Sequence, residues 1–296
     1  MIKFLKKRCE LMMMKNKPKI ILAGTPEFAV ETFEKIIQNF NVLAIISQPD
    51  KPANRGYKLQ YTPTKILAEK YQIKVYQPEK IIDIYEELKS YDYDILLSCA
   101  FGQFIPTKVL ELAKKGSLNI HGSLLPKYRG AAPIQHSLLN GDDVTGICLI
   151  YMVNKMDAGD IIFEKSINID LKDTSETLFK KLSSLSAENI VKWLEDFYNG
   201  NFKIKKQNED LVTLAPKLEK QSALIEQVLT VNDAFNKIRA FSSNPGAYLF
   251  FQNKRLKVYY ASKDFVKNAP EINLSDGKLY AVDYQFESKK RVKLQK

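Results

Sequence analysis

The chain has 296 residues and a mass of 34.0 kDa, which is enough for one large domain or two domains of ordinary size. Hydrophobic residues make up 45% of it and charged residues 27%, a balance that is typical of globular proteins and excludes long disordered or fibrous segments. Three cysteines without a C-x-x-C pair and only two histidines exclude a disulfide framework and a structural zinc site. We therefore expect a reducing compartment, the cytoplasm, and no bound metal.

The formal net charge of +11 is carried by the two ends of the chain. Residues 1–19 hold seven Lys or Arg and one Glu, and residues 207–296 hold fifteen Lys or Arg and ten acidic residues. Residues 20–206 hold equal numbers of both signs. An excess of basic residues favours a polyanionic partner. Because charges interrupt the apolar residues of the N-terminus, we expect residues 1–18 to be a basic extension without a secretory or membrane-spanning role.

From Lys19 onward, short apolar runs alternate with longer amphipathic ones. The pattern predicts strands over 19–23, 42–47, 94–100, 117–122 and 145–153, and helices over 27–38, 64–72, 105–115 and 132–141. Such alternation predicts a Rossmann-like, doubly wound α/β domain with a mostly parallel sheet. A longer helix is expected from Thr174, where Glu176 and Thr177 offer an N-cap and a first-turn carboxylate, to the Asn-Gly pair at 199–200. This first domain spans residues 19–200.

Residues 201–210 form a polar and basic stretch without an apolar period, so a linker is expected over residues 201–214. A smaller domain follows over 215–296, with one helix at 231–241 and several short β-rich runs, which favours a small β-barrel or a sandwich. We expect four aromatic residues of these runs in its core: Tyr248, Phe250, Tyr259 and Tyr260. Only a basic stretch without a strand pattern follows residue 286, so this C-terminal domain is expected to be shortened.

Two polar side chains mark the end of the strand at 117–122. Asn119 and His121 are two residues apart, so both project from one face at the carboxyl end, the edge at which open α/β sheets bind ligands. An amide and an imidazole side by side suit a carbonyl substrate, because both can donate to a developing oxyanion and the imidazole moves protons near neutral pH. Asp157, in a later loop, could orient His121 or accept an amine proton through water. Taken singly, Asn119 and His121 could be structural hydrogen-bonding residues, and Asp157 an ordinary turn residue.

These segments together resemble the folate-dependent formyltransferases. The resemblance rests on N-x-H-G-S-L-L-P-x-x-R-G-A-A-P-I-Q at 119–135 and on M-D-A-G-D at 156–160. Within the family, A-G-T-P-E-F at 23–28 and Q-P-D-K-P-A-N-R-G-Y-K-L at 48–59 resemble the members that act on methionyl initiator tRNA. The C-terminal part matches less well: the family's N-P-W-P-G-A is replaced by S-S-N-P-G-A at 242–247.

The resemblance implies an enzyme that transfers the formyl group of 10-formyltetrahydrofolate to the amino group of the methionine on initiator tRNA, as a monomer without a metal. Asn119, His121 and Asp157 match the family's catalytic trio. In that role Asn119 and His121 would hydrogen-bond the formyl oxygen, and Asp157 would orient His121. The family's folate contact falls on four consecutive residues: Ser123, Leu124, Leu125 and Pro126.

The polyanion would then be the tRNA. The 49–62 loop could be a solvated surface loop by composition, but the resemblance implies that it enters the acceptor end of the tRNA, with Arg55 and Lys58 in contact. It also implies that the C-terminal domain is an OB-like barrel that binds tRNA, mostly through phosphates.

Rival functions remain open at this point. A formyltransferase acting on glycinamide ribonucleotide or an amino sugar nucleotide would share the trio but needs neither the Arg55 loop nor a basic second domain. A non-catalytic RNA-binding module would not need the intact trio. The chain also lacks G-x-S-x-G, Walker A and G-x-G-x-x-G motifs, which disfavours acyl-serine chemistry, P-loop hydrolysis and a nicotinamide-dependent oxidoreductase.

Overall fold

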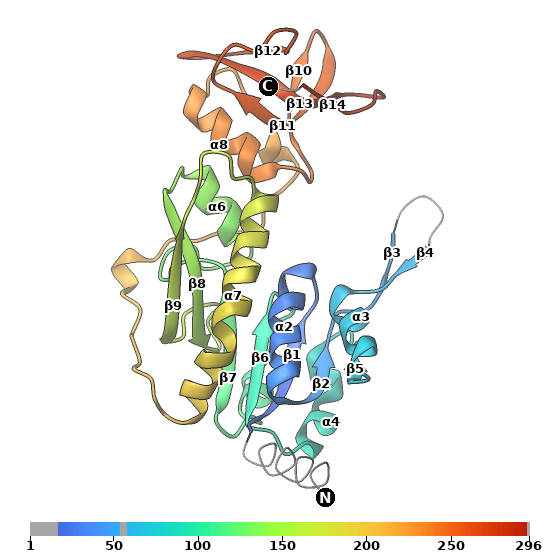
Figure 1. Ribbon diagram of the computed structural model, residues 1–296, viewed down its shortest axis with the longest axis vertical. Helices are drawn as coiled ribbons and strands as arrows, with labels where there is room; N and C mark the ends of the chain where they lie inside the picture. The colour runs from blue at the N-terminus through green and yellow to red at the C-terminus, as the bar shows by residue number, and fades with distance from the viewer. Residues whose placement is uncertain (1–16, 54–57, 295–296) are drawn as a thin grey trace, which may run out of the picture. The chain divides into compact units, whose positions relative to one another are not determined.

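The computed structural model describes residues 17–53 and 58–294 (Figure 1). Nearly all of the expected N-terminal extension, and Arg55, lie outside the described residues. The chain forms two compact units that interleave along the sequence. The first unit consists of Met1–His121, Ile147–Lys165 and Leu182–Asp210, and the second of Gly122–Gly146, Ser166–Lys181 and Leu211–Lys296.

A seven-stranded sheet in the order β5-β2-β1-β6-β7-β8-β9 organises the first unit. Its parallel part consists of β5 (Lys74–Tyr76), β2 (Asn41–Ile46), β1 (Lys19–Gly24), β6 (Ile95–Cys99) and β7 (Gly116–His121). Strand β8 (Val144–Tyr151) is antiparallel to β7, and β9 (Ile161–Asn168) forms the edge. The expected α/β domain with a mostly parallel sheet is therefore confirmed.

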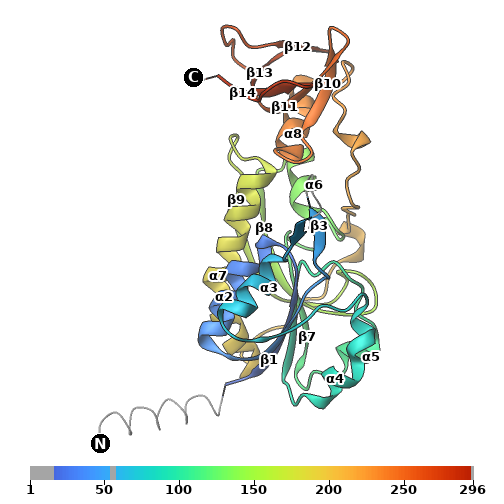
Figure 2. The same ribbon diagram turned by 90° about the vertical axis from the view of Figure 1, so that its right-hand side faces the viewer.

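Helices cover both faces of this sheet (Figures 1 and 2). Helix α2 (Glu27–Asn39) lies along α7 (Ser175–Tyr198), where the Thr32 hydroxyl donates to the Ser186 oxygen at 2.9 Å. Helix α3 (Pro63–Lys70) lies beside α2. The opposite face packs on η1 (Ile81–Ile84), α4 (Tyr85–Ser90) and α5 (Thr107–Leu110). Because β1 is covered on both sides, its residues Ile20 to Ala23 are all fully buried, as expected for a central parallel strand.

Helix α5 is shorter than the predicted helix over 105–115. It ends at Leu110, because the backbone N–H groups of Lys114 and Lys115 donate to the carbonyls of Tyr93 and Asp94 instead of continuing the helix. Helix α7 agrees with prediction at both ends. The Thr174 hydroxyl oxygen accepts from the N–H of Thr177 at 3.4 Å, and the helix stops at Tyr198 before a glycine, Gly200, with φ of +78°.

The expected surface loop at 49–62 contains a hairpin. Its strands are β3 (Lys51–Ala53) and β4 (Lys58–Gln60), paired in antiparallel register. Lys58 belongs to β4, and Arg55 falls in the undescribed connection between the two strands. The alternation that predicts strands was not visible in such short segments.

The second unit contains an antiparallel sheet and two main helices. The sheet has the order β10-β11-β13-β12, with β14 also on β13; its strands are β10 (Ala247–Phe251), β11 (Lys254–Ser262), β12 (Glu271–Leu274), β13 (Gly277–Phe286) and β14 (Val292–Lys293). Helix α8 (Val231–Phe241) packs against α6 (Pro133–Leu139) and the sheet. Two short helical turns, η2 (Glu209–Leu211) and η3 (Gln221–Ala223), complete the described elements.

Two details of this sheet differ from expectation. Phe250 is 66% exposed rather than part of the core, because it is on the outward face of β10, opposite Arg255. Tyr259 is buried, and Tyr248 and Tyr260 are half-buried. A strand, β14, also follows residue 286, and it is too short and basic for a pattern to reveal it. Across the described residues, no helix has the length and apolar character needed to span a membrane.

Candidate active site

The structure brings Asn119, His121 and Asp157 together at the carboxyl end of β7. Asn119 Nδ2 donates to Asp157 Oδ1 at 3.4 Å, and His121 Nδ1 lies 3.5 Å from Asp157 Oδ2. Both distances are at the long end of the hydrogen-bond range. His121 is 5% exposed and the Asp157 side chain 12% exposed, so the carboxylate acts in a largely water-excluded setting. The catalytic roles of the three residues stay predictions.

The Asp157 turn joins β8 to β9 and is tightly constrained. Asp157 has φ of +51°, in the left-handed region. Gly159 is required by close approach, since a Cβ there would lie 1.8 Å from the Tyr151 carbonyl oxygen. Gln207, from the segment expected to be a linker, donates its Nε2 to the carbonyls of Asp157 at 2.8 Å and Gly159 at 2.7 Å. Gln207 lies in a segment without a periodic pattern, so no local sequence signal points to it.

Three loops are joined at the carboxyl edge of β1, β2 and β6. Thr25 Oγ1 and Gln48 Nε2 both donate to the Phe101 carbonyl, at 2.9 and 3.0 Å. Gly102, with φ of +79°, leaves room for the Gln48 amide, which a Cβ would meet at 2.4 Å. Residue Ser98 pairs with Asn119 in the sheet, so the loop after β6 emerges beside the trio. This loop after β6 is not identified from the sequence, although the A-F-G segment directly after a buried strand is a signal for it. Beyond that segment, Phe104 is 65% exposed.

The predicted folate-binding residues begin the second unit. Ser123 is fully buried, and its hydroxyl donates to the Lys127 carbonyl at 2.6 Å. Leu125 is 3% exposed, whereas Leu124 and Pro126 are half-exposed. The side chains of Leu124 and Pro126 are therefore the ones in this segment that a ligand could contact.

Backbone hydrogen bonds fix the loop that follows. The N–H of Arg129 donates to the Thr213 carbonyl at 2.9 Å, and the N–H of Ala215 donates to the Arg129 carbonyl at 2.7 Å. Gly130 is needed here, because a Cβ would lie 2.6 Å from the Ala215 carbonyl oxygen and its φ is +129°. The end of the expected linker thus holds the R-G-A-A-P loop in place.

Asp50 anchors the base of the β3–β4 hairpin. Its carboxylate accepts from the Thr62 N–H at 3.1 Å and the Gln77 amide at 2.9 Å, and it forms an ion pair with Lys65. Burial alone would raise the pKa of Asp50, but the hydrogen bonds from Lys65, Gln77 and Thr62 outweigh it and lower that pKa. Because Asp50 precedes β3 and Thr62 follows β4, one charged group ties both ends of the hairpin.

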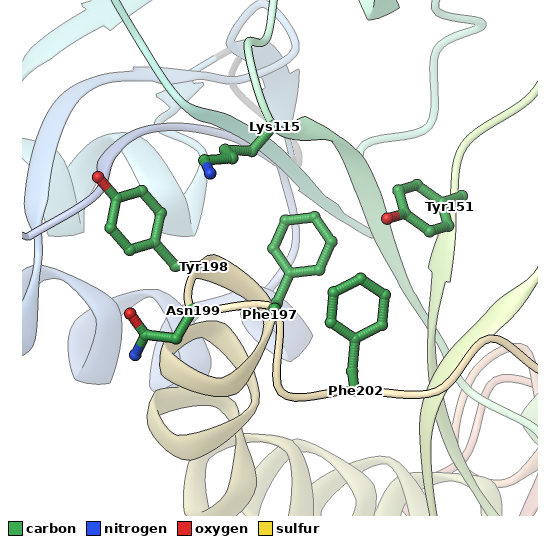
Figure 3. A pocket seen from close by; sticks show the side chains of 7 residues that line it. Lys115, Tyr151, Phe197, Tyr198, Asn199 and Phe202 are labelled. Atoms are coloured by element: carbon green, nitrogen blue, oxygen red, sulfur yellow. The ribbon is translucent and has the colours of Figure 1, made fainter.

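A cavity in the first unit lies away from the trio. It has a volume of about 250 Å³ and is lined by aromatic and polar residues: Lys115, Tyr151, Phe197, Tyr198, Asn199, Gly200 and Phe202 (Figure 3). Lys115 and the start of β7 are at the opposite end of this strand from His121. The volume is below the roughly 300–1,000 Å³ of ordinary ligand sites. No predicted site residue lines this cavity.

Residues 17–53 and 58–294 contain no group of three or more His, Cys, Asp or Glu side chains placed to hold a metal ion. The two cysteines of the described region, Cys99 and Cys148, are both buried. Burial raises the pKa of the Cys99 thiol to about 12, so this group is unreactive near neutral pH.

Fold and trio geometry define a class of protein, and comparison with known proteins agrees. The chain belongs to the formyl transferase family: the family model described as formyl transferase matches residues 18–194, and the model for the formyl transferase C-terminal domain matches residues 217–296.

Curated relatives are named methionyl-tRNA formyltransferase. One from Mycoplasmopsis pulmonis is 54% identical over 277 residues, covering 93% of this chain and 96% of the relative. Another, from Mycoplasma capricolum, is 44% identical, covering 83% of this chain and 78% of the relative.

A solved structure with a similar fold is the N-formyltransferase from Helicobacter canadensis in complex with folinic acid and dTDP-3-aminofucose. It superposes with a TM-score of 0.69 at 22% identity, over 91% of this chain and all of that one. This likeness concerns the fold alone.

Proposed function

We propose that this chain transfers the formyl group of 10-formyltetrahydrofolate to the α-amino group of the methionine carried by initiator tRNA. The observation that carries the proposal is the Asn119–Asp157–His121 cluster, at the ligand-binding edge of a formyl transferase fold. A relative that is 54% identical over 93% of this chain and is named methionyl-tRNA formyltransferase supports the acceptor. The expected setting is a monomer in the cytoplasm, where translation begins.

In this reaction the neutral methionyl amine adds to the formyl carbon, and the bond from that carbon to the folate nitrogen breaks. Negative charge develops on the formyl oxygen, which Asn119 and His121 stabilise as hydrogen-bond donors. Asp157 orients His121 and, through water, helps to move the amine proton towards the departing nitrogen. The donor is already an activated amide, so the chemistry needs no metal.

We further propose that Ser123, Leu124, Leu125 and Pro126 contact the formyl donor. Leu124 and Pro126 are half-exposed and supply apolar surface, whereas the buried Ser123 and Leu125 contribute backbone groups. Arg55 and Lys58, on the hairpin, are proposed to contact the acceptor end of the tRNA. Domain boundaries of 19–200, 201–214 and 215–296 are retained as predictions, with the last segment as the tRNA-binding domain.

An acceptor assay with radiolabelled 10-formyltetrahydrofolate tests the function. We expect label on methionyl initiator tRNA, and none on glycinamide ribonucleotide, an amino sugar nucleotide or free methionine. Label only on one of the small acceptors would overturn the acceptor assignment and leave a formyltransferase of another kind. Absence of label on every acceptor, with binding of tRNA retained, would favour a non-catalytic RNA-binding role.

A further inference from the structure

The segment 205–209 runs alongside the Asp157 turn, and backbone hydrogen bonds fix the alignment of the two. Lys205 and Ile161 exchange both backbone hydrogen bonds, each at 2.9 Å, as an antiparallel bridge. In this antiparallel register Gln207, two residues after Lys205, falls opposite Gly159, two residues before Ile161. An ion pair between Lys155 and Glu209, at 3.2 Å, adds a second link to the same turn. These contacts place Gln207 beside the turn independently of the hydrogen bonds that its own side chain makes.

The Gln207 amide contacts the turn through two short hydrogen bonds. Its Nε2 donates to the carbonyl oxygens of Asp157 at 2.8 Å and of Gly159 at 2.7 Å. An NH₂ group has two hydrogens, so a single amide can satisfy both carbonyls at once. The side chain is half-buried, which strengthens hydrogen bonds relative to those in open water.

The turn needs this support because of its backbone conformation. A non-glycine residue in the left-handed region, as Asp157 is at φ of +51°, is in an unfavourable backbone conformation that persists where surrounding contacts impose it. The Asp157 oxygens reach Asn119 and His121 at 3.4 and 3.5 Å, so little further separation can be tolerated. A turn that relaxed by a fraction of an ångström would break the trio.

We infer that Gln207 is a positioning residue: it holds the Asp157 turn in the conformation that directs the carboxylate to Asn119 and His121. This inference rests on the proposed function for its catalytic consequence. It assigns a role in catalysis to a segment that its composition describes only as a linker. The substrates do not need to touch Gln207 for this effect.

Two substitutions at Gln207 and a matched control test the inference. Gln207→Leu removes the amide at similar size, and Gln207→Glu replaces its NH₂ donor with an oxygen of the same shape. We expect kcat for tRNA formylation to fall roughly 10- to 100-fold in both, because a displacement of about 1 Å can cost 10²-fold. KM for tRNA and for the formyl donor should change less than about twofold. Gln38→Leu, on α2, removes an amide that donates to the Tyr71 hydroxyl, and should leave all constants unchanged.

A second readout does not depend on activity. The chain has only two histidines, so the imidazole proton signals of His121 and His136 can be resolved by NMR in the free protein. His136 belongs to the other unit, where its Nε2 lies 3.1 Å from the Pro216 carbonyl oxygen. We expect Gln207→Leu and Gln207→Glu to move the His121 signal, since the neighbouring carboxylate shifts, and to leave the His136 signal in place.

The outcomes separate the inference from the function on which it rests. Unchanged kcat in both variants, or a loss of kcat with an unmoved His121 signal, overturns the positioning role. If Gln207→Leu unfolds, the same criteria apply to the isosteric Gln207→Glu. A wild-type chain that formylates no acceptor refutes the proposed function, and the His121 signal still decides whether Gln207 positions Asp157.

Discussion

Asp157 uses both carboxylate oxygens, one towards Asn119 and one towards His121. The Nδ1 side of the imidazole faces the carboxylate, so a proton on Nδ1 is favoured and Nε2 is the nitrogen directed away from Asp157. The proposed donation to the formyl oxygen therefore requires the imidazolium form, in which Nε2 also carries a proton. One residue thus orients an amide and an imidazole relative to each other. The arrangement depends on the negative charge of Asp157 as well as on its shape.

The substitution Asp157→Asn removes the negative charge of residue 157 and keeps its shape, so it tests the two contributions separately. The substituted amide keeps one oxygen but presents an NH₂ group to one of the partners, so the imidazole can adopt the wrong tautomer. We expect kcat to fall about 10²- to 10⁴-fold, as for general acid–base groups and their orienting carboxylates, with KM for tRNA nearly unchanged. Single-turnover formylation measures the effect.

Asp92→Asn is the matched control for this substitution. Asp92 is an exposed aspartate that pairs with Lys19 and Lys114, so its replacement removes the same charge from the same unit. Its formylation rate should equal that of the wild type. Comparable losses in the two variants would assign the effect to net charge and contradict the role of Asp157.

The trio was only partly predictable from local sequence. Asn119 and His121 share a face because side chains alternate along a strand, so their spacing in the sequence is enough to predict it. Asp157 reaches them through a turn of unusual backbone conformation, and Gln207 supports that turn from 50 residues away. Neither feature leaves a periodic pattern. Only the motif resemblance could single out Asp157, and nothing singled out Gln207.

At the scale of elements, helices and central strands followed from apolar periodicity, and the differences arose from long-range backbone bonds. The segment at 213–215 bonds to the R-G-A-A-P loop, and Lys205 bonds to Ile161, although the segment 201–214 has no apolar period that would predict these contacts. Strand β9 was missed because exposed charged residues, Glu164 and Lys165, interrupt its apolar pattern. These contacts are made by backbone groups, which hardly differ between residue types, so the pattern of side chains in the sequence does not reveal them.

The β3–β4 hairpin provides a prediction at this scale. Asp50→Asn weakens the link between its two ends, because the charge that pairs with Lys65 is lost. If the hairpin contacts tRNA, we expect KM for tRNA to rise roughly three- to tenfold, equivalent to about 1 kcal/mol, with KM for the formyl donor unchanged. Glu34→Gln, which breaks the ion pair to Lys70 between α2 and α3, should leave KM for tRNA unchanged.

The same aspartate predicts a pH dependence of stability. The folded-state pKa of Asp50 is lowered, so its stabilisation is fully present above the pKa of a free Asp, roughly 3.9, and is lost as pH falls through the lower folded-state value. The difference in unfolding midpoint between wild type and Asp50→Asn should therefore be largest near pH 7 and shrink below about pH 4. A difference that grows on acidification would contradict the charged state assigned to Asp50.

At the scale of the whole molecule, the net charge of +11 gains meaning from its location. Residues 20–206, which contain the trio, are balanced, and residues 207–296 carry an excess of five positive charges. Several cations of the C-terminal sheet are already paired, such as Arg291 with Asp283 and Lys278 with Glu271. Lys289 and Lys290 are exposed between β13 and β14, and we propose that they contact phosphates of the tRNA.

If the C-terminal domain binds phosphates, kcat/KM for tRNA should depend steeply on salt concentration, whereas KM for the formyl donor should not. Each phosphate contact releases counterions, so log kcat/KM for tRNA should fall linearly with log salt concentration, by about 0.7 to 0.9 in slope per contact. Lys289→Ala combined with Lys290→Ala should reduce that slope by roughly 1 to 2 and leave KM for the formyl donor unaffected. The double variant Lys35→Ala and Lys192→Ala removes the same charge from exposed positions in the balanced segment, and should preserve the slope. Equal changes in both double variants would show that total charge governs tRNA binding, whereas a change confined to Lys289 and Lys290 places the phosphate contacts on the C-terminal sheet.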